Sequence, residues 1–467
     1  MIGADRGLPL LMDGALPPDL QGTLVRVGPG AANGAAPDDS DEPPERGALH
    51  AVELRDGQAV TYRRHASPAD AGVFWHAGAI LALPERGLPF RYSRHLEPED
   101  FAGGLTVPIA SHVRRDATDG SRVLFAVDDG TDGEGGGDGV EAEEEHDVWL
   151  RFGEWDAGGA LRRGMALSLE RATWQHDIGL TSAHIVFIES PTQRLRDPGD
   201  VAVPFGWLPD ANAWLGTVRR DGDGSDVRWA RLDPCLVTHV LGAHEVPAPG
   251  RGAPGGVEAG SPELVVYVCV YDAPEHDQPV DTTASVVGPA GVALTSIGGG
   301  LGSLERWRIV GDRVERTQLD DRAVEYPRLD AACEAKTFRY GYAVEVAWDG
   351  TGVPARRAGV APGTVVDRGC HGVGLLQFDL DRDVVASWSP GPGLTCTEPL
   401  FVRAEDGRSD DEGWLLTLVD DPDRGASDLY VLDASALGRR RPEAVIHLPE
   451  RLPARSHGEW VPAGRYR

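Results

Sequence analysis

The chain has 467 residues and a formal net charge of −29 at pH 7. A chain this acidic repels nucleic acid and anionic membrane surfaces, so neither is an expected partner. Its 60 glycines and 35 prolines, against only 3 methionines, favour many short elements joined by turns over long helices.

Short apolar runs bounded by Gly, Pro or Asp recur along the whole chain. In chain order they occupy residues 22–28, 77–83, 122–127, 184–189, 263–271, 372–380 and 413–419. Residues 304–319 have the pattern of two strands around a Gly-Asp turn. Runs of this length that are rich in Val, Leu, Ile and aromatic residues predict β-strands, and convincing amphipathic helices are few. The predicted fold class is therefore all-β.

No domain boundary stands out, so residues 1–467 are predicted to form a single domain. Residues 128–147 are Gly-rich and acidic, and they lack the regular carboxylate spacing of an EF-hand, so a flexible surface loop is expected there. A β-propeller protects strand edges by radial repetition. Seven four-stranded blades would take about 67 residues each, a plausible blade length. We therefore predict a seven-bladed β-propeller.

The cysteines and the N-terminus bear on the compartment. Five cysteines without a CxxC pair argue against a disulfide framework or a Cys-based zinc site, and fit a reducing compartment. The first residues lack the basic region and apolar core of a signal peptide. No run approaches the roughly 20 apolar residues of a membrane span. A cytoplasmic protein is expected, with a monomer as the default.

Four of the 14 histidines are distinguished by their positions. His112, His176 and His239 are separated by 64 and 63 residues, which is close to one blade, and His457 lies near the end of the chain. Equivalent positions on successive blades all face the propeller axis, so these side chains could converge there. Any one of them taken alone would more often be a structural residue.

Four converging neutral imidazoles suit a borderline metal such as Fe, Zn or Cu. Zinc prefers a tetrahedral site, which four histidines would close, whereas octahedral Fe(II) would keep two positions open for dioxygen and substrate. Carboxylates would orient the rings by accepting their other N–H groups. Glu85, Glu325 and Glu398 are candidates because each lies in an apolar or proline-flanked setting. Taken alone, each would more often be a surface or turn acid.

These residues lie in motifs that resemble the carotenoid cleavage oxygenase family. The similarity runs nearly end to end, through LPPDLQGTLVRVGPG, HAGAILALPERGLPFRYS, ASHVRRDATDG, WQHDIGLTSAHIVFIESP, VRWARLDPCLVTHVLGAHE, VEYPRLD, TCTEPLFV and LPERLPARSHGEWVP. The His-Asp pair, the Glu-aromatic-Pro-Arg run and the terminal His-Gly are specific when they occur together and in order.

The resemblance implies a seven-bladed propeller with Fe(2+) on its axis and a cap of loops that forms an apolar substrate tunnel. The family's four iron ligands are matched by His112, His176, His239 and His457. The three glutamates that orient those ligands are matched by Glu85, Glu325 and Glu398. Two other histidines fall off the motif positions and are interpreted as structural, His184 and His244. Members of the family cleave a substrate double bond with dioxygen to give two carbonyl products.

We therefore predict a non-haem Fe(II) dioxygenase that cleaves a conjugated carbon-carbon double bond of a carotenoid or apocarotenoid. Its reaction partners would be a small apolar alkene and O2. The alternative is a stilbenoid- or phenylpropanoid-cleaving dioxygenase on the same iron site, but Pro84 stands where stilbene-cleaving members carry a lysine. Isomerisation without cleavage stays open. A catalytically inactive propeller that only binds is a further alternative. It is kept open by Gly242, where the family motif has Asn, and by ERGALHAVELRDG, which replaces the family's expected run near residue 45, although all seven positions of the metal site are filled.

Overall fold

The computed structural model describes residues 10–29, 47–100, 108–130, 147–194, 205–208, 210–246, 262–272, 302–347, 371–439, 441–452 and 457–463. In these ranges the chain forms strands throughout, and the short 3-10 helix η1 (Ala434–Ala436) is the one helical segment. The all-β prediction is confirmed. No helix of the described ranges has the length and apolar character needed to cross a membrane. Most of the predicted acidic loop, residues 131–146, lies outside the described residues.

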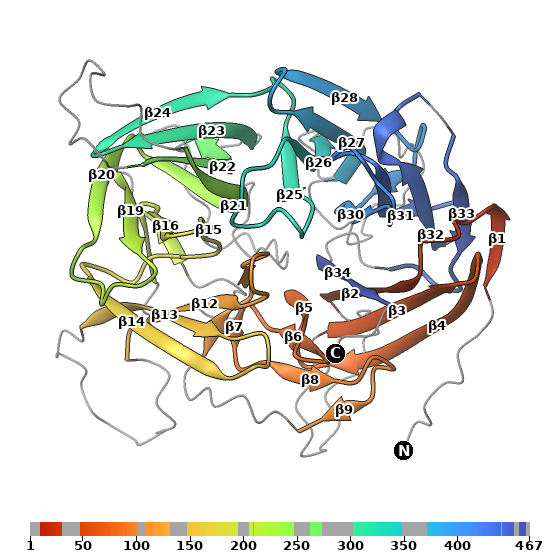
Figure 1. Ribbon diagram of the computed structural model, residues 1–467, viewed down its shortest axis with the longest axis horizontal. Coiled ribbons are helices and arrows are strands. Elements are labelled where there is room, and N and C mark those ends of the chain that lie inside the picture. The colour runs from red at the N-terminus through yellow and green to blue at the C-terminus, as the bar shows by residue number, and fades with distance from the viewer. Residues whose placement is uncertain are drawn as a thin grey trace, which may run out of the picture.

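The described strands form seven antiparallel blades of four strands, arranged in a ring around a central axis (Figure 1). This confirms the predicted seven-bladed propeller. From the innermost strand outward, blade 1 consists of β34 (His457–Pro462), β2 (Gly22–Pro29), β3 (Gly47–Arg55) and β4 (Gln58–Ser67). Blade 2 consists of β5 (Gly72–His76), β6 (Ala79–Leu83), β8 (Phe90–Tyr92) and β9 (Pro98–Glu99). Blade 3 consists of β11 (Arg114–Arg115), β12 (Arg122–Asp128), β13 (Val148–Trp155) and β14 (Leu161–Leu169).

The ring continues with blades 4 and 5. Blade 4 consists of β15 (Gly179–Leu180), β16 (His184–Glu189), β19 (Ala213–Arg219) and β20 (Arg228–Leu232). Blade 5 consists of β21 (Cys235–Val246), β22 (Glu263–Asp272), β23 (Ser303–Val310) and β24 (Arg313–Gln318). Two small ribbons lie outside the blades, formed by β7 (Arg86–Gly87) with β10 (Ile109–Ala110) and by β17 (Thr192–Arg194) with β18 (Phe205–Trp207).

Blades 6 and 7 share one larger sheet. Blade 6 consists of β25 (Val324–Arg328), β26 (Tyr340–Ala347), β27 (His371–Asp379) and β28 (Val384–Trp388). Blade 7 consists of β30 (Leu400–Arg403), β31 (Gly413–Asp421), β32 (Ala426–Asp433) and β33 (Ala444–His447). The short strand β29 (Thr395–Cys396) pairs with both β27 and β31 and so joins the two blades.

Strands from the two ends of the chain close the ring. In blade 1, the C-terminal β34 pairs with β2 from Gly22↔Pro462 to Val27↔His457. At the neighbouring blade, β1 (Leu11–Gly14) pairs with the outer strand β33. Each closure satisfies backbone groups that would otherwise form a free edge. The C-terminal strand is therefore the innermost strand of its blade, which brings His457 to the axis.

The hydrophobic core is divided among the seven blade interfaces. Each of seven buried clusters contains side chains from two adjacent blades. Between blades 3 and 4, for example, Phe152 packs against Phe187 with ring centroids 5.8 Å apart. Because a blade is covered on both faces, every residue of β6 is buried. Apolar packing thus lies between the blades, and the axis is left to polar side chains.

The seven single runs and the hairpin predicted from the sequence all contain strands, with small shifts at their ends. The run at 77–83 begins as a turn, because Ala77 and Gly78 have φ values of 48° and 82°, and the strand starts at Ala79. Positive φ at successive residues is typical of tight hairpin turns. In the 304–319 hairpin, the predicted Gly-Asp turn joins β23 to β24.

Strand β1 is tied to β33 and β32 by a titratable contact, in which His447 lies between Asp13 and Asp428. We call this contact the clasp. His447 Nδ1 lies 2.9 Å from Asp428 Oδ1, and its Nε2 lies 3.2 Å from Asp13 Oδ2. Partial burial lowers the pKa of His447, but hydrogen bonds to the two aspartates outweigh it and raise that pKa. Since the folded pKa is raised, the clasp stabilises β1 fully below the unfolded pKa of about 6.5. The stabilisation is lost as pH rises through the folded pKa.

We therefore expect His447→Gln to speed amide exchange of β1 at pH 6 by up to about fivefold, the value for a contact of no more than ~1 kcal/mol. At pH 9 the wild type and the variant should exchange alike. Hydrogen exchange, corrected for intrinsic rates, checks this, with β34 as an internal control that should not change. An acceleration of equal size at both pH values would contradict the account.

Candidate metal centre

Each blade contributes one histidine or glutamate to the axis. Blades 3, 4, 5 and 1 supply the histidines, at or just before their innermost strands: His112, His176, His239 and His457. Blades 2, 6 and 7 supply the glutamates, after β6, within β25 and just before β30: Glu85, Glu325 and Glu398. All seven residues predicted from the sequence are thus brought into one group. His184 and His244 lie outside it: His184 contacts Glu245, and His244 packs between two aromatic rings.

Two of these positions lie in irregular stretches of strand. The pairing of β21 with β22 shifts register between Val237 and Val240, which takes His239 out of the ladder. The pairing of β25 with β26 shifts between Glu325 and Arg328. Extra residues of this kind bend a strand and redirect its side chains. These irregularities explain how His239 and Glu325, which lie within paired strands, can direct their side chains to the axis.

The four imidazole rings form a close cluster. Nε2 of His112 lies 3.1 Å from Nε2 of His176. The ring centroid of His112 lies 5.1 Å from that of His239 and 4.8 Å from that of His457. One nitrogen from each of His112, His239 and His457 lies within 4.8 Å of the other two. The rings therefore enclose one small space on the axis.

Three of the four histidines are each paired with one of the glutamates. The Nδ1 to carboxylate distances are 2.7 Å for His176 with Glu85, 2.6 Å for His239 with Glu325 and 2.9 Å for His457 with Glu398. Each Nδ1–H donates to its carboxylate, so each Nε2 keeps its lone pair. His112 has no such carboxylate among the described residues, but the neighbouring Ser111 donates to Glu85 at 3.2 Å.

The three carboxylates are held by different groups. Glu325 also accepts hydrogen bonds from the hydroxyls of Thr238 at 2.7 Å and Tyr271 at 2.6 Å. Glu398 instead contacts two guanidinium groups, with Arg26 Nη1 at 3.2 Å and Arg328 Nε at 3.0 Å. Charge-assisted hydrogen bonds of this kind hold a buried carboxylate in one orientation.

Gly458 is required by the close approach of Arg26. The Gly458 N–H donates to Glu398 Oε2 at 2.8 Å. A Cβ at this position would lie 2.7 Å from Cδ of Arg26. The glycine that follows His457 in the sequence therefore lets a fully buried arginine reach the partner of that histidine.

Two aromatic side chains pack against the histidine rings. Trp174 stacks on His176 at 4.7 Å, and its indole N–H donates to Glu85 at 3.3 Å. The ring of Tyr326 contacts those of His239 and His457 at 5.4 and 5.5 Å. Tyr326 holds a positive φ of 54°, a strained value for a bulky residue that is typical of functional sites.

Asp177 joins the segment of His176 to that of His239. Its carboxylate accepts the backbone N–H groups of Ile178 and Val240, both at 2.8 Å. It also accepts the Nε–H of Arg114 at 2.9 Å. These contacts show that Asp177 fixes the backbone of both segments.

The pKa shifts favour a neutral ring at His112 and His457, whereas that of His176 favours the protonated ring. Burial and the neighbouring histidines lower the pKa of His112 well below its usual value. Burial also lowers the pKa of His457, in spite of Glu398, whereas Glu85 raises that of His176 against the effect of burial. Burial would raise the pKa of Glu325, but His239 and the two hydroxyls lower it to about 2. An ionised carboxylate behind a neutral imidazole is the arrangement that metal-binding histidines require.

The geometry fits a metal ion. Two imidazole nitrogens bound at about 2.1 Å to one ion, at right angles, lie about 3 Å apart, as the Nε2 atoms of His112 and His176 do. Nε2 of His239 is buried and has no hydrogen-bond partner in the described structure, so a polar atom is left without compensation. Four neutral nitrogen donors suit a borderline divalent transition metal.

The fold and the site together define a β-propeller with a cluster of histidines on its axis. Known proteins share this arrangement of the chain. The family described as retinal pigment epithelial membrane protein matches residues 62–462. The chain therefore belongs to this family, that of the carotenoid cleavage oxygenases, which confirms the resemblance found in the sequence.

Curated relatives span nearly the whole chain. The carotenoid cleavage oxygenase of Mycobacterium tuberculosis (strain CDC 1551 / Oshkosh) is 24% identical over 97% of this chain and 94% of its own length. Resveratrol cleavage oxygenase 1 of Chaetomium globosum is 26% identical over 97% of this chain and 84% of its own. The chain is thus similar to oxygenases named for two different substrate classes.

Solved structures share the fold. Lignostilbene dioxygenase of Pseudomonas brassicacearum has a TM-score of 0.74 at 20% identity, covering 99% of this chain and 96% of its own. Cobalt-substituted apocarotenoid oxygenase of Synechocystis has a TM-score of 0.73 at 20% identity, covering 97% and 95%. At these identities the likeness concerns the fold alone.

Proposed function

We propose that the chain is a non-haem Fe(II) dioxygenase that cleaves a conjugated carbon–carbon double bond of a carotenoid or apocarotenoid with O2. The observation that carries the proposal is the group of four axial histidines, three of them paired with buried or partly buried glutamates. His112, His176, His239 and His457 would hold the iron. When bound, Fe(II) would supply the activation of dioxygen for insertion into the substrate double bond.

The glutamates would orient the imidazole rings that hold the metal. The glutamates hold the three Nδ1–H groups, so that Nε2 of each ring points to the common space. The four neutral imidazoles would hold the iron without neutralising its charge. No side chain is required as a general base, because cleavage by O2 removes no proton from the substrate.

A buried apolar cluster next to the histidines supports an apolar substrate. Trp174, Leu236 and Tyr271 form a buried cluster, against which Phe205 and Trp207 of β18 pack while half-buried. We call these five residues the aromatic cluster. Trp174 is also the residue that stacks on His176. Because Trp174, Leu236 and Tyr271 are buried, a polyene would contact the half-buried rings of Phe205 and Trp207, and we propose that this contact helps to select the bond that is cleaved.

The second candidate is a hydroxylated stilbenoid or phenylpropanoid substrate, which the names of several relatives favour. A lysine is the group that such members place beside the first glutamate, and here Pro84 precedes Glu85. The chain has a single lysine, Lys336, whose Nζ donates to the carbonyl of Ala117 at 3.0 Å. A lysine is therefore not available to bind a substrate phenol at this site, and we place the apocarotenoid first.

A substrate comparison tests this order. We expect iron-loaded protein to cleave an apocarotenal with kcat/KM at least about tenfold above that for a hydroxystilbene, because no cationic amine is present to hold the phenol. Product aldehydes are measured by chromatography, with His176→Ala as the inactive control. Cleavage of the hydroxystilbene alone would overturn the substrate class and keep the chemistry. Retinoid or polyene isomers without aldehydes would indicate isomerisation.

Compartment and assembly are part of the same proposal. We propose a cytoplasmic monomer. The four cysteines in the described ranges are free, three of them buried, which fits a reducing compartment.

A further inference from the structure

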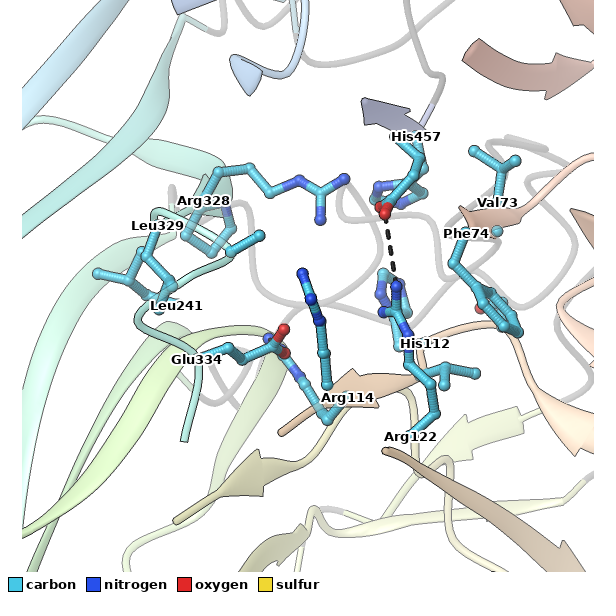
Figure 2. Close-up of a pocket in the computed structure, with 17 residues that line it drawn as sticks. Val73, Phe74, His112, Arg114, Arg122, Leu241, Arg328, Leu329, Glu334 and His457 are labelled. Atoms are coloured by element: carbon cyan, nitrogen blue, oxygen red, sulfur yellow. Dashed lines mark hydrogen bonds and ion pairs between the residues drawn. The ribbon is translucent and has the colours of Figure 1, made fainter. Parts of the chain in front are cut away.

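A cavity of about 90 Å³ lies on the propeller axis beside the histidine cluster, with His112 and His457 in its wall (Figure 2). Its other lining residues come from blades 1, 2, 3, 5 and 6. Arg114 and Glu459 lie two residues after these histidines, so the cavity extends from the cluster along the innermost strands. None of the aromatic cluster lines it. The cavity is therefore distinct from the aromatic cluster, which is assigned above to the substrate.

Guanidinium groups dominate the charged part of the wall. Four lining residues are arginines and two are glutamates: Arg114, Arg115, Arg122, Arg328, Glu334 and Glu459. Figure 2 shows the side chains of Arg114, Arg328 and Glu334 extending into the same open space. In a chain with a net charge of −29, four arginines line this one small, partly open space.

Two of these arginines keep donors for a ligand. Arg122 uses Nη2 for the carbonyl of Trp75 at 2.9 Å and for Glu459 at 3.4 Å. Arg328 uses Nη2 for Glu398 and the Gly458 carbonyl, and its Nε lies 3.0 Å from Glu398 as an ion pair without hydrogen-bond geometry. In the described part of the chain, Nη1 of neither arginine has a hydrogen-bond partner, and neither atom is sealed from solvent. Both side chains line the cavity.

The charged residues that line the cavity are mainly positive, with four guanidinium groups against two carboxylates. Asp177, Glu398 and Glu85 contact Arg114, Arg328 and Ser111 of the wall from behind. Guanidinium donors in the wall therefore outnumber the carboxylates in the wall, which favours an anion over a cation as the ligand.

We propose that this cavity binds one small, planar, monovalent oxyanion. The forked N–H groups of a guanidinium match two oxygens of a planar anion. A cavity of this size holds a few water molecules, about 30 Å³ each, or an anion of three or four heavy atoms such as formate, nitrate or bicarbonate. Benzoate is too large. The proposal does not depend on the proposed oxygenase function.

Substitutions of Arg122 and Glu459, which form one ion pair, test whether the cavity binds an anion. Arg122 and Glu459 contact each other at 3.4 Å, and neither contacts Glu85, Glu325 or Glu398. Glu459→Gln removes a negative charge from the wall and should tighten nitrate binding about fivefold. Arg122→Gln removes a positive charge and a donor and should weaken it at least about tenfold. Both variants break the same pair, so a general loss of structure cannot produce opposite shifts.

The experiment is calorimetric titration of nitrate into the full chain, iron-loaded without oxygen and metal-free. We expect one site per chain in both forms, shifted in opposite directions by the two variants, with formate and bicarbonate competing and benzoate not binding. Binding to the iron-loaded form alone would place the anion on the metal and overturn the proposal. So would no binding in either form, equal shifts in the two variants, or binding of benzoate with the same affinity.

Discussion

Replacement of His239 by alanine should abolish iron binding. This histidine is 4% exposed, its Nδ1 donates to Glu325 at 2.6 Å, and its Nε2 has no partner other than the proposed ion among the described residues. Loss of a hydrogen-bond partner of a metal ligand typically lowers metal affinity about 10- to 100-fold. Loss of the ligand itself should exceed this, and double-bond cleavage should fall to background.

Iron per chain, measured by emission spectrometry after anaerobic loading, checks this result. The matched control is His184→Ala, because His184 is also part-buried, also contacts a glutamate at 3.0 Å and lies outside the cluster. We expect the control to retain iron and cleavage. Full iron content in His239→Ala would show that this ring is not a ligand.

Replacement of Glu398 by glutamine should cost more folding stability than the same change at Glu325. Glu398 contacts Arg26, which is 1% exposed, and Arg328, whereas Glu325 contacts hydroxyls and an imidazole. Removing one partner of a buried ion pair typically costs about 3–5 kcal/mol. A glutamine at position 325 can still accept a hydrogen bond from Thr238 or Tyr271, so it should cost much less.

Urea unfolding of the metal-free variants separates these effects from metal binding. Glu398→Gln is expected to lower the unfolding free energy by about 3 kcal/mol or more. Glu325→Gln is expected to change it little, but to lower iron affinity about 10- to 100-fold. Equal stability of the two variants would mean that Arg26 does not depend on Glu398.

The propeller could be predicted because its blades repeat. The steps of 64 and 63 residues between His112, His176 and His239 correspond to one blade, and the structure places all three beside innermost strands. Apolar runs such as residues 184–189 became inner strands because both blade faces are buried. Boundaries were less predictable where turn residues were apolar, as at Ala77.

The glutamates could not be derived from the pattern of residues. Glu85 follows β6, Glu325 lies in β25, and Glu398 precedes β30, so no constant spacing links them. Their assignment came from the family resemblance. Arg26, separated from Glu398 by 372 residues, was missed entirely, as was Tyr271, because a contact of this kind depends on ring closure. Ser111, Trp174 and Thr238 carried one signal, their closeness in sequence to a candidate histidine.

Gly242 was a departure from the family motif, and its surroundings offer a structural reason. A Cβ at this position would lie 2.4 Å from Cδ2 of Leu329 and 2.9 Å from the ring of Phe338. A larger residue here would require both neighbours to move. The departure is explained by packing and gives no support to a propeller without catalytic function.

The central claim is that the four axial histidines hold iron that cleaves a conjugated alkene with O2. The most direct measurement loads the full chain with Fe(II) under anaerobic conditions, determines the iron content, adds an apocarotenal and then admits oxygen. The account predicts close to one iron per chain and two carbonyl products that form only after oxygen enters. A chain that retains no iron under these conditions would contradict the site and the function built on it.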